Sequence, residues 1–432
     1  MDSKLIINII ADDLTGAADT GIQFAKNGLY SVLFPLGLQV ANIHKSEVIA
    51  LNTATRDIQP ESAYDEVRNA VQFLMRKRHP MFIYKKIDST LRGNVGVEIE
   101  AVMDATDGMY AILAPAFPAC GRTTEAGVHF VNSRPVAHTE VANDLVNPVN
   151  ESHIPTLIRS QTGLEVGHIA LAEVRHGSET LQKYILQHIE DGEKIIVFDA
   201  ITDGDLGIVA EAGMSMSYPP LMVGSAGLAD QISRLWPVSE SRRIYRSSHT
   251  KMGNDGLIII VSGSLSVVTA QQLDYIGKVG KAEIISIDVC DQIGNQGNNL
   301  ECDSIIVSKI MSAAETNRVI GIRSVKVTQP EEMRDLPRLV VDWLGKLVSQ
   351  VVRDYPGPVQ GLIITGGDTA LAVFRQLKIT QMHLIDEILP GIPYGHTIGD
   401  GSAGLDIVTK AGSFGRTDAL EKCIDFLIGV CR

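Results

Sequence analysis

Two adjacent aspartates, Asp12 and Asp13, end the first apolar run of the chain, in the segment LIINIIADDLTGAAD. An aspartate at the junction of a strand and a helix can cap the helix by accepting a backbone N–H. One helix needs only one such cap, so the second carboxylate is available as a general base, or as an anchor for hydroxyl groups or Mg²⁺. We expect Asp13 to cap the helix and Asp12 to contact a substrate.

A second group of polar residues lies in the segment YKKIDSTLRGN. Lys86 and Arg92 are suited to bind a small carboxylate, Arg92 through a bidentate contact, while Asp88 and Ser89 can bind hydroxyl groups. Arg56, in NTATRD, ends the preceding expected strand and can join them. The alternative interpretation is a basic turn that precedes a helix without binding anything.

Three loops rich in glycine and hydroxyl residues lie in the C-terminal half: VSGSLSVVTAQQ, ITGGDTALAV and GDGSAGLDIVTKAGSFG. Such loops let backbone N–H groups approach phosphates, and a helix that follows adds a favourable dipole. The turn Gly366-Gly367-Asp368-Thr369 stands between an expected strand and helix, where a purely structural turn is the alternative. Three such loops in one half favour a phosphate or nucleotide site.

Two common nucleotide-binding motifs are not supported. GDGSAG fits the pattern G-x-G-x-x-G, but the strand-like LDIVTK follows it, so the dinucleotide motif lacks its helix. A Walker A sequence is absent. If the C-terminal half binds ATP, it does so without the common P-loop.

The elements that must position these residues alternate along the chain. In the N-terminal half the apolar runs are KLIINIIA, SVLFPL, EVIALNT, MFIYKK, MYAILAPAF, KIIVFDA and PLMVGSA. Amphipathic segments lie between them, and the one at 63–77 places Val67, Val71, Phe73 and Leu74 near helical spacing. This alternation predicts an α/β fold with a mostly parallel sheet, whose ligands bind beyond the carboxyl ends of the strands.

The polar segment SESRRIYRSSHTKMGND interrupts the alternation, which then resumes with GLIIIVSG, AEIISID, RVIGIRSV and GLIITGG. A chain of 432 residues also exceeds the usual size of a single core. We therefore predict two domains, over 1–240 and 250–432, each a mostly parallel sheet flanked by helices, with the active site in the cleft between them.

The composition excludes several classes of protein. The formal net charge of −13 argues against a surface for nucleic acid or anionic lipid, because both require clustered positive charge. The five cysteines are scattered without a C-x-x-C pair, so we expect reduced thiols. We see neither a signal peptide nor an apolar stretch long enough to span a membrane, which predicts a cytoplasmic protein.

Seven segments, in order along nearly the whole chain, closely resemble motifs of the four-carbon acid sugar kinases, a family long described only as a domain of unknown function. They are ADDLTGAAD, KKIDSTLRGN, APAFPACGRTT, VGSAGLA, VSGSLS, ITGGDTA and TKAGSFG. The resemblance implies an N-terminal domain that binds the sugar acid and a C-terminal domain that binds ATP. It also implies phosphoryl transfer to the 4-hydroxyl of D-threonate, D-erythronate or 3-oxo-tetronate.

The resemblance assigns roles residue by residue. The acid-sugar site is expected to use Asp12 and Arg56 with the segment Lys86-Ile87-Asp88-Ser89, to which the sequence adds Arg92. The ATP site is expected to use Ser264, the turn Gly366-Gly367-Asp368-Thr369 and the loop around Gly412. In the resulting hypothesis Asp12 orients or deprotonates the hydroxyl, Lys86 or Arg92 offsets negative charge, and Mg²⁺ bridges the ATP phosphates.

Several alternatives remain open at this stage. The base can instead be Asp13 or Asp88, and the sequence does not identify the ligands of Mg²⁺. We favour D-threonate or D-erythronate over 3-oxo-tetronate as substrate. A nucleotide-responsive binding or regulatory protein without turnover is the alternative from another class, and an NAD(P)-dependent oxidoreductase ranks below it. The oligomeric state cannot be read from the sequence, and a homodimer is compatible with it.

Overall fold

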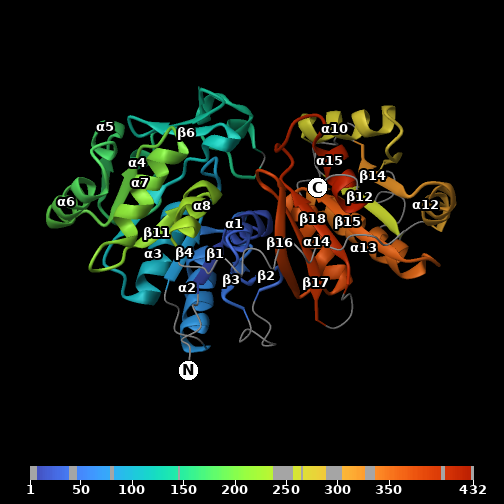
Figure 1. Ribbon diagram of the computed structural model, residues 1–432, viewed down its shortest axis with the longest axis horizontal. Coiled ribbons are helices and arrows are strands. Elements are labelled where there is room, and N and C mark those ends of the chain that lie inside the picture. Colours follow the sequence, from blue (N-terminus) through green and yellow to red (C-terminus); the bar gives the residue numbers. More distant parts are fainter. Residues whose placement is uncertain are drawn as a thin grey trace. The chain divides into compact units, whose positions relative to one another are not determined.

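The computed structural model describes residues 7–37, 46–77, 82–144, 146–236, 256–263, 266–288, 304–325, 336–399 and 404–429. The chain forms two compact units (Figure 1). The N-terminal unit contains Met1–Leu33 and Val40–Arg243, and the C-terminal unit contains Phe34–Gln39 and Ile244–Arg432. The polar segment that interrupts the alternation, residues 239–255, lies outside the described residues.

The N-terminal unit is built on a sheet with strand order β2-β3-β1-β4-β11-β5-β10-β9. Its pairs β1/β3, β1/β4, β11/β4, β11/β5, β10/β5 and β10/β9 are all parallel. These strands are β1 (Ile7–Ala11), β2 (Ser31–Phe34), β3 (Val48–Asn52), β4 (Phe82–Lys86), β5 (Ala111–Ala114), β9 (Val166–Ile169), β10 (Ile195–Phe198) and β11 (Leu221–Gly224). The predicted α/β class is confirmed, although β9 was not predicted.

Helices of this unit form two packed groups. In the first, α1 packs against α8, α8 against α7 and α7 against α6, while α2 packs against α3 in the second. They are α1 (Leu14–Lys26), α2 (Pro60–Lys77), α3 (Val95–Thr106), α6 (Ser178–Glu190), α7 (Asp203–Met214) and α8 (Ala226–Leu235), with the shorter α4 (Ile154–Arg159) and α5 (Leu171–Val174). The expected helix at 63–77 is α2, and Val67, Val71 and Leu74 are buried on it while Phe73 is half-buried.

A small antiparallel sheet, absent from the prediction, interrupts the alternation of strands and helices after β5. It consists of β6 (Arg122–Glu125), β7 (Val128–Val131) and β8 (Arg134–Pro135). Asp199, at the end of β10, accepts the amides of Ala126 and Gly127 in the turn between β6 and β7. The turn of this small sheet is thereby tied to a strand end of the main sheet.

The C-terminal unit has a sheet with strand order β13-β14-β12-β15-β18-β17-β16. The pairs from β13 to β18 are parallel, whereas β16/β17 and β17/β18 are antiparallel. The strands are β12 (Leu257–Ser262), β13 (Glu283–Ile287), β14 (Val319–Ser324), β15 (Val359–Thr365), β16 (Gln381–Leu389), β17 (Ile392–Ile398) and β18 (Asp406–Lys410). β18 is the strand expected from LDIVTK after the discounted GDGSAG motif.

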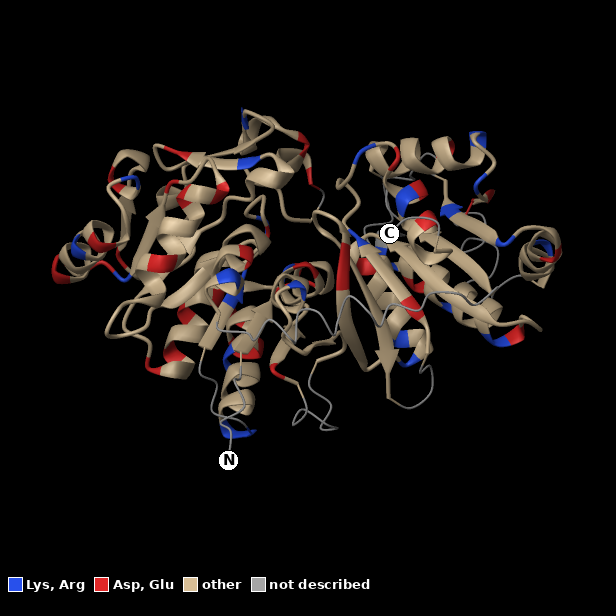
Figure 2. Cartoon of the chain, viewed as in Figure 1, with Lys and Arg blue, Asp and Glu red and all other residues tan. Residues whose placement is uncertain are grey.

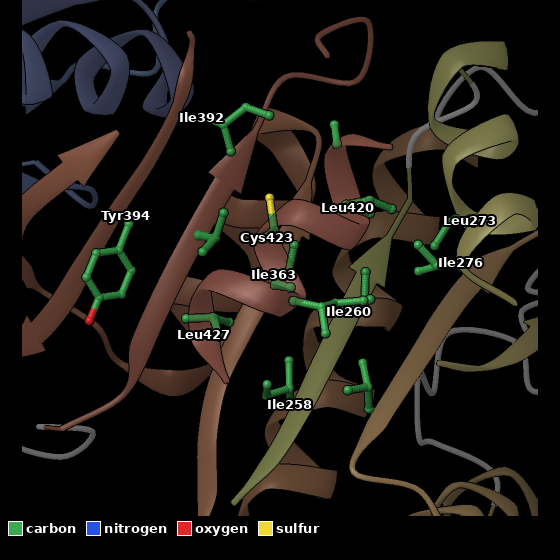
Figure 3. Packing of buried hydrophobic residues seen from close by; sticks show 14 residues of the cluster. Ile258, Ile260, Leu273, Ile276, Ile363, Ile392, Tyr394, Leu420, Cys423 and Leu427 are labelled. Atoms are coloured by element: carbon green, nitrogen blue, oxygen red, sulfur yellow. The ribbon is translucent and has the colours of Figure 1, made fainter. Parts of the chain in front are cut away.

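The core of this unit lies between the sheet and its helices. Figure 3 shows Leu420 and Cys423 of α15 (Ala419–Leu427) packed in one buried cluster with Ile260 of β12 and Ile363 of β15. The other helices among the described residues of this unit are α10 (Val267–Lys278), α12 (Ser304–Thr316), α13 (Leu336–Asp354) and α14 (Gly367–Leu377). Lys and Arg are interspersed with Asp and Glu along each unit (Figure 2). Within the described residues, every helix is too short or too polar to cross a membrane.

Candidate active site

The ends of four neighbouring parallel strands bring the predicted polar residues of the N-terminal unit together. In the register of the sheet, Ala11 of β1 lies between Asn52 of β3 and Lys86 of β4, and Lys86 in turn lies beside Gly224 of β11. The segments that follow these strands therefore begin at the same edge of the sheet. Asp12 follows β1 at this edge, and the Ile87-Asp88-Ser89 segment follows β4.

Arg56 lies at the centre of this group. Its Nε is 2.7 Å from Oδ2 of Asp12, and its Nη2 is 3.1 Å from Oδ1 of Asp12 and 2.7 Å from Oδ1 of Asp13. Nη2 also lies 3.7 Å from Oδ1 of Asp88. Burial alone would lower the pKa of the Arg56 guanidinium, but the three carboxylates raise it well above its ordinary value.

Arg92 holds the other side of Asp88. Its Nε donates to Oδ2 at 2.9 Å and its Nη2 to Oδ1 at 3.1 Å, a bidentate pair, and Nη1 reaches Asp144 at 3.2 Å. Burial would raise the pKa of the Asp88 carboxyl, but Arg92 and Arg56 outweigh it and the pKa lies well below its ordinary value. Arg56 and Arg92 are thus both engaged by carboxylates of the protein itself.

Asp13 caps α1, as predicted. Its side chain accepts the amide of Gly16 at 2.9 Å and the hydroxyl of Thr15 at 2.5 Å. Burial would raise the pKa of the Asp13 carboxyl, but the charges of Arg56 and Lys86 outweigh it and lower the pKa. The Asp13 carboxylate is thus held by the helix cap, by Thr15 and by Arg56, whereas among the described residues the Asp12 side chain accepts from Arg56 alone.

Lys86 differs from the two arginines. Lys86 is 3% exposed. Its Nζ lies 3.9 Å from Oδ1 of Asp19, close enough for an ion pair but beyond hydrogen-bond distance. Among the residues that the structure describes, the Lys86 ammonium donates no hydrogen bond. The preceding Lys85 points to the opposite face of β4, where its Nζ is 2.5 Å from Oε2 of the buried Glu98 on α3. The two adjacent lysines therefore have separate surroundings.

Backbone hydrogen bonds hold Ile87 and Ser89 in place. The Ile87 side chain is buried, and its amide donates to the carbonyl of Gly224 at 3.0 Å. The carbonyl of Ser89 lies 2.8 Å from Nε2 of His129 on β7, and Nδ1 of His129 lies 3.1 Å from the Thr124 hydroxyl. Because a carbonyl can only accept, Nε2 is the protonated nitrogen of this buried imidazole.

The sequence assigns no role to His129. Burial lowers the pKa of its imidazole to about 4, so it is neutral near pH 7. It joins the small antiparallel sheet to the Asp88-Ser89 segment and so helps to hold that segment in place. No sequence signal near His129 indicates this contact, which joins positions 40 residues apart.

The glycine-rich loops of the C-terminal unit also follow neighbouring parallel strands. Ser262 of β12 lies beside Thr365 of β15, and Thr365 lies beside Lys410 of β18. A Cβ atom placed on Gly263 would come within 2.7 Å of the Thr369 hydroxyl, so the turn before α14 packs closely on the loop after β12. All three loops therefore start at one edge of this sheet.

The predicted nucleotide residues are distributed over these loops. Gly366 is the N-cap of α14 and donates its amide to the carbonyl of Lys410 at 2.8 Å, with Gly367, Asp368 and Thr369 forming the first turn of the helix. The carbonyl of Gly412 accepts from the Thr269 hydroxyl at 2.7 Å. Ser264 lies outside the described residues. The described parts of the chain hold no group of three His, Cys, Asp or Glu that could bind a metal ion.

Both units match known domains. A family model described as a sugar-binding N-terminal domain matches residues 7–232, and one described as a nucleotide-binding C-terminal domain matches residues 259–420. The chain therefore combines a sugar-binding domain with a nucleotide-binding domain.

Relatives are similar to the chain over its full length. The D-erythronate kinase of Heliobacterium modesticaldum is 30% identical over 97% of this chain and 96% of the relative. The D-threonate kinase of Salmonella typhimurium is 30% identical over 95% and 96%, and the 3-oxo-tetronate kinase of Burkholderia multivorans is 25% identical over 99% and 98%. The chain belongs to the four-carbon acid sugar kinase family, and it is a phosphotransferase.

A crystal structure from Salmonella typhimurium, described as that of a tRNA synthase, has a similar fold. Its TM-score is 0.78, with 23% sequence identity, and the match covers 96% of this chain and 98% of the other. At this identity the likeness shows the fold alone.

Proposed function

We propose that this kinase transfers the γ-phosphoryl group of ATP to the 4-hydroxyl of D-threonate or D-erythronate. The observation in this chain that supports the proposal most directly is the state of Lys86. Its ammonium is nearly buried at a strand end, forms an ion pair with Asp19 at 3.9 Å, and donates no hydrogen bond to a described residue. A cation held in this way is suited to bind the carboxylate of a small acid.

The arrangement around Arg56 supports a positioning role for Asp12 in this mechanism. Both oxygens of Asp12 accept from Arg56, and each oxygen retains a second acceptor site. Asp12 can therefore accept a hydrogen bond from the 4-hydroxyl while Arg56 fixes its orientation. Phosphoryl transfer demands mainly positioning and charge stabilisation, so a carboxylate held by an arginine is adequate for this task.

Two features support binding of the ATP phosphates by the C-terminal unit: three glycine-rich loops begin at one edge of its sheet, and residues of the loop after β18 are exposed. Gly366 to Thr369, Ser264 and Gly412 are the residues that we assign to the nucleotide. The bound Mg²⁺ would offset negative charge on the phosphates. Since the described residues offer no ready set of metal ligands, we expect Mg²⁺ to enter with ATP.

The experiment that tests the proposal is a coupled assay of ADP release with D-threonate, D-erythronate, 3-oxo-tetronate and their enantiomers. We expect turnover with D-threonate or D-erythronate, and ³¹P NMR of the product should place the phosphate on the 4-hydroxyl. A preference for 3-oxo-tetronate would identify that acid as the substrate in place of D-threonate or D-erythronate. The Burkholderia relative is named as a kinase of this acid. Nucleotide binding without turnover on any acid would favour a regulatory protein.

Two variants test the assigned roles. Lys86→Met should raise KM for the acid and lower kcat/KM by about 10- to 100-fold, the equivalent of one lost charged hydrogen bond. The exposed Lys183 on α6 provides the matched control, Lys183→Met. Asp12→Asn should lower kcat, and a fall of less than about tenfold would mean that Asp12 contributes under about 1.4 kcal/mol and is not the base.

A further inference from the structure

Lys410, the last residue of β18, is a fully buried cation. Among the described residues it is paired with no carboxylate. Its Nζ donates instead to the carbonyl oxygens of Ala411 at 2.9 Å, Phe414 at 3.1 Å and Gly412 at 3.3 Å, and lies 3.4 Å from the Thr269 hydroxyl. Burial of an ammonium without a counter-charge is costly, so its presence here requires a reason.

Gln272 of α10 holds the same loop from a second direction. Its Nε2 lies 3.1 Å from the carbonyl oxygen of Phe414, 3.1 Å from that of Gly415 and 2.9 Å from that of Arg416. Gln272 is fully buried. The buried side chains of Lys410 and Gln272 therefore donate to most carbonyls of the 411–416 loop, which point toward the interior.

The direction of these carbonyls sets the direction of the amides. In a planar trans peptide the N–H points away from the C=O, so a carbonyl turned inward places the next amide outward. Within the described residues, no hydrogen bond is donated by the amides that follow the inward carbonyls, those of Gly412, Ser413, Gly415, Arg416 and Thr417. Ser413, Gly415 and Arg416 are exposed. Outward amides on a loop of this kind form a concave site for an anion.

We propose that Lys410 is a positioning residue for the phosphate groups of the nucleotide, because it orients the 411–416 loop so that its free amides face phosphate oxygens. The inference rests on the proposed use of ATP by this unit. An anion on the outer side of the loop also supplies the negative charge that the buried ammonium lacks. The thiol of Cys423 on α15 interacts with Lys410, but burial raises the pKa of this thiol to about 12, so it stays neutral and supplies no negative charge.

Lys410 also joins two of the glycine-rich loops. Its own carbonyl accepts the amide of Gly366, the N-cap of α14. The side chain of Lys410 therefore orients the loop that follows β18, and its backbone fixes the start of the turn that follows β15. A substitution at Lys410 removes the side-chain contacts with the loop after β18 but keeps the backbone hydrogen bond to Gly366.

The test compares the full-length wild-type chain with Lys410→Met, which keeps most of the side-chain volume and removes the donors. Isothermal titration calorimetry measures binding of ATP, tripolyphosphate and adenosine. We expect the affinity for ATP and tripolyphosphate to fall at least tenfold while the affinity for adenosine changes less than twofold. Lys278→Met, at an exposed position on α10, is the matched control and should bind all three like the wild type.

Equal losses for adenosine and tripolyphosphate, or no loss for either, would overturn the proposal. If Lys410→Met does not fold, Gln272→Met removes the second set of contacts and should show the same selective loss of tripolyphosphate binding. A wild-type chain that binds tripolyphosphate but never releases ADP would refute the proposed kinase reaction and leave the loop assignment standing.

Discussion

Substitution of Gly16 by alanine should damage the acid-sugar site while leaving the fold intact. A Cβ atom at this position would lie 2.5 Å from Oδ1 of Asp13 and 2.7 Å from Nζ of Lys86, whereas ordinary contacts begin at 3.4 Å. Both atoms are the ends of side chains and can retreat. The added methyl group therefore displaces two side chains. They are Asp13, which caps the helix, and Lys86, which we assign to the substrate carboxylate.

The expected magnitudes separate activity from stability. Alanine in a helix is favoured over glycine by about 0.5–1 kcal/mol, and weakening of the Asp13 cap costs about 1 kcal/mol, so the free energy of unfolding should change little. Displacement of a substrate-positioning group by about 1 Å can cost about 100-fold in rate. We expect kcat/KM for the acid to fall by 10- to 100-fold, or roughly 1.4–2.7 kcal/mol.

The assay is ADP release at varied acid and at varied ATP, together with urea unfolding. Gly204→Ala is the matched control, because its Cβ would meet only the Thr202 hydroxyl, at 3.6 Å, on the exposed first turn of α7. Its activity should equal that of the wild type. If Gly16→Ala folds and retains kcat/KM within about threefold of the wild type, the position of Lys86 is not important for catalysis.

Three further predictions concern the same site. Folding lowers the pKa of His129 from 6.5 to about 4, so as the pH falls the imidazole is protonated in the unfolded chain before it is protonated in the folded one. The free energy of unfolding should therefore drop by about 3 kcal/mol between pH 6.5 and about pH 4. His129→Gln should flatten this slope in urea unfolding at several pH values, and an unchanged slope would contradict the assignment. Asp88→Asn should destabilise the protein by about 3 kcal/mol at pH 7, because Arg92 and Arg56 lose a buried partner. Since the pKa of Asp88 is lowered, this difference should shrink as pH falls below 3.8, and a difference independent of pH would count against the ion pairs. EDTA should stop ADP release and added Mg²⁺ restore it; turnover in excess EDTA would show that no divalent cation is needed.

The part of the site that follows from local patterns could be predicted from the sequence. Each apolar run of the N-terminal half listed above corresponds to a strand, and the polar residues after it lie at the strand end because a parallel sheet aligns its carboxyl ends. The cap by Asp13 also depends only on residues within the next turn. The antiparallel strands β16 and β17 escaped prediction, since their pairing depends on contacts with β18 rather than on a distinctive local pattern.

The α/β class, the aspartates at the end of the first strand and the glycine-rich loops could all be predicted without a structure, because these features depend on periodicity and on neighbouring residues. The folded structure adds the reason why Lys85 and Lys86 have different partners: adjacent strand residues point to opposite faces, so Lys85 pairs with Glu98 while Lys86 lies near Asp19. Folding also brings Arg56 into hydrogen-bond contact with Asp12, 44 residues away in the chain. It places the Lys410 ammonium against the carbonyls of the 411–416 loop. Long-range contacts of this kind arise from packing, and no local pattern encodes them.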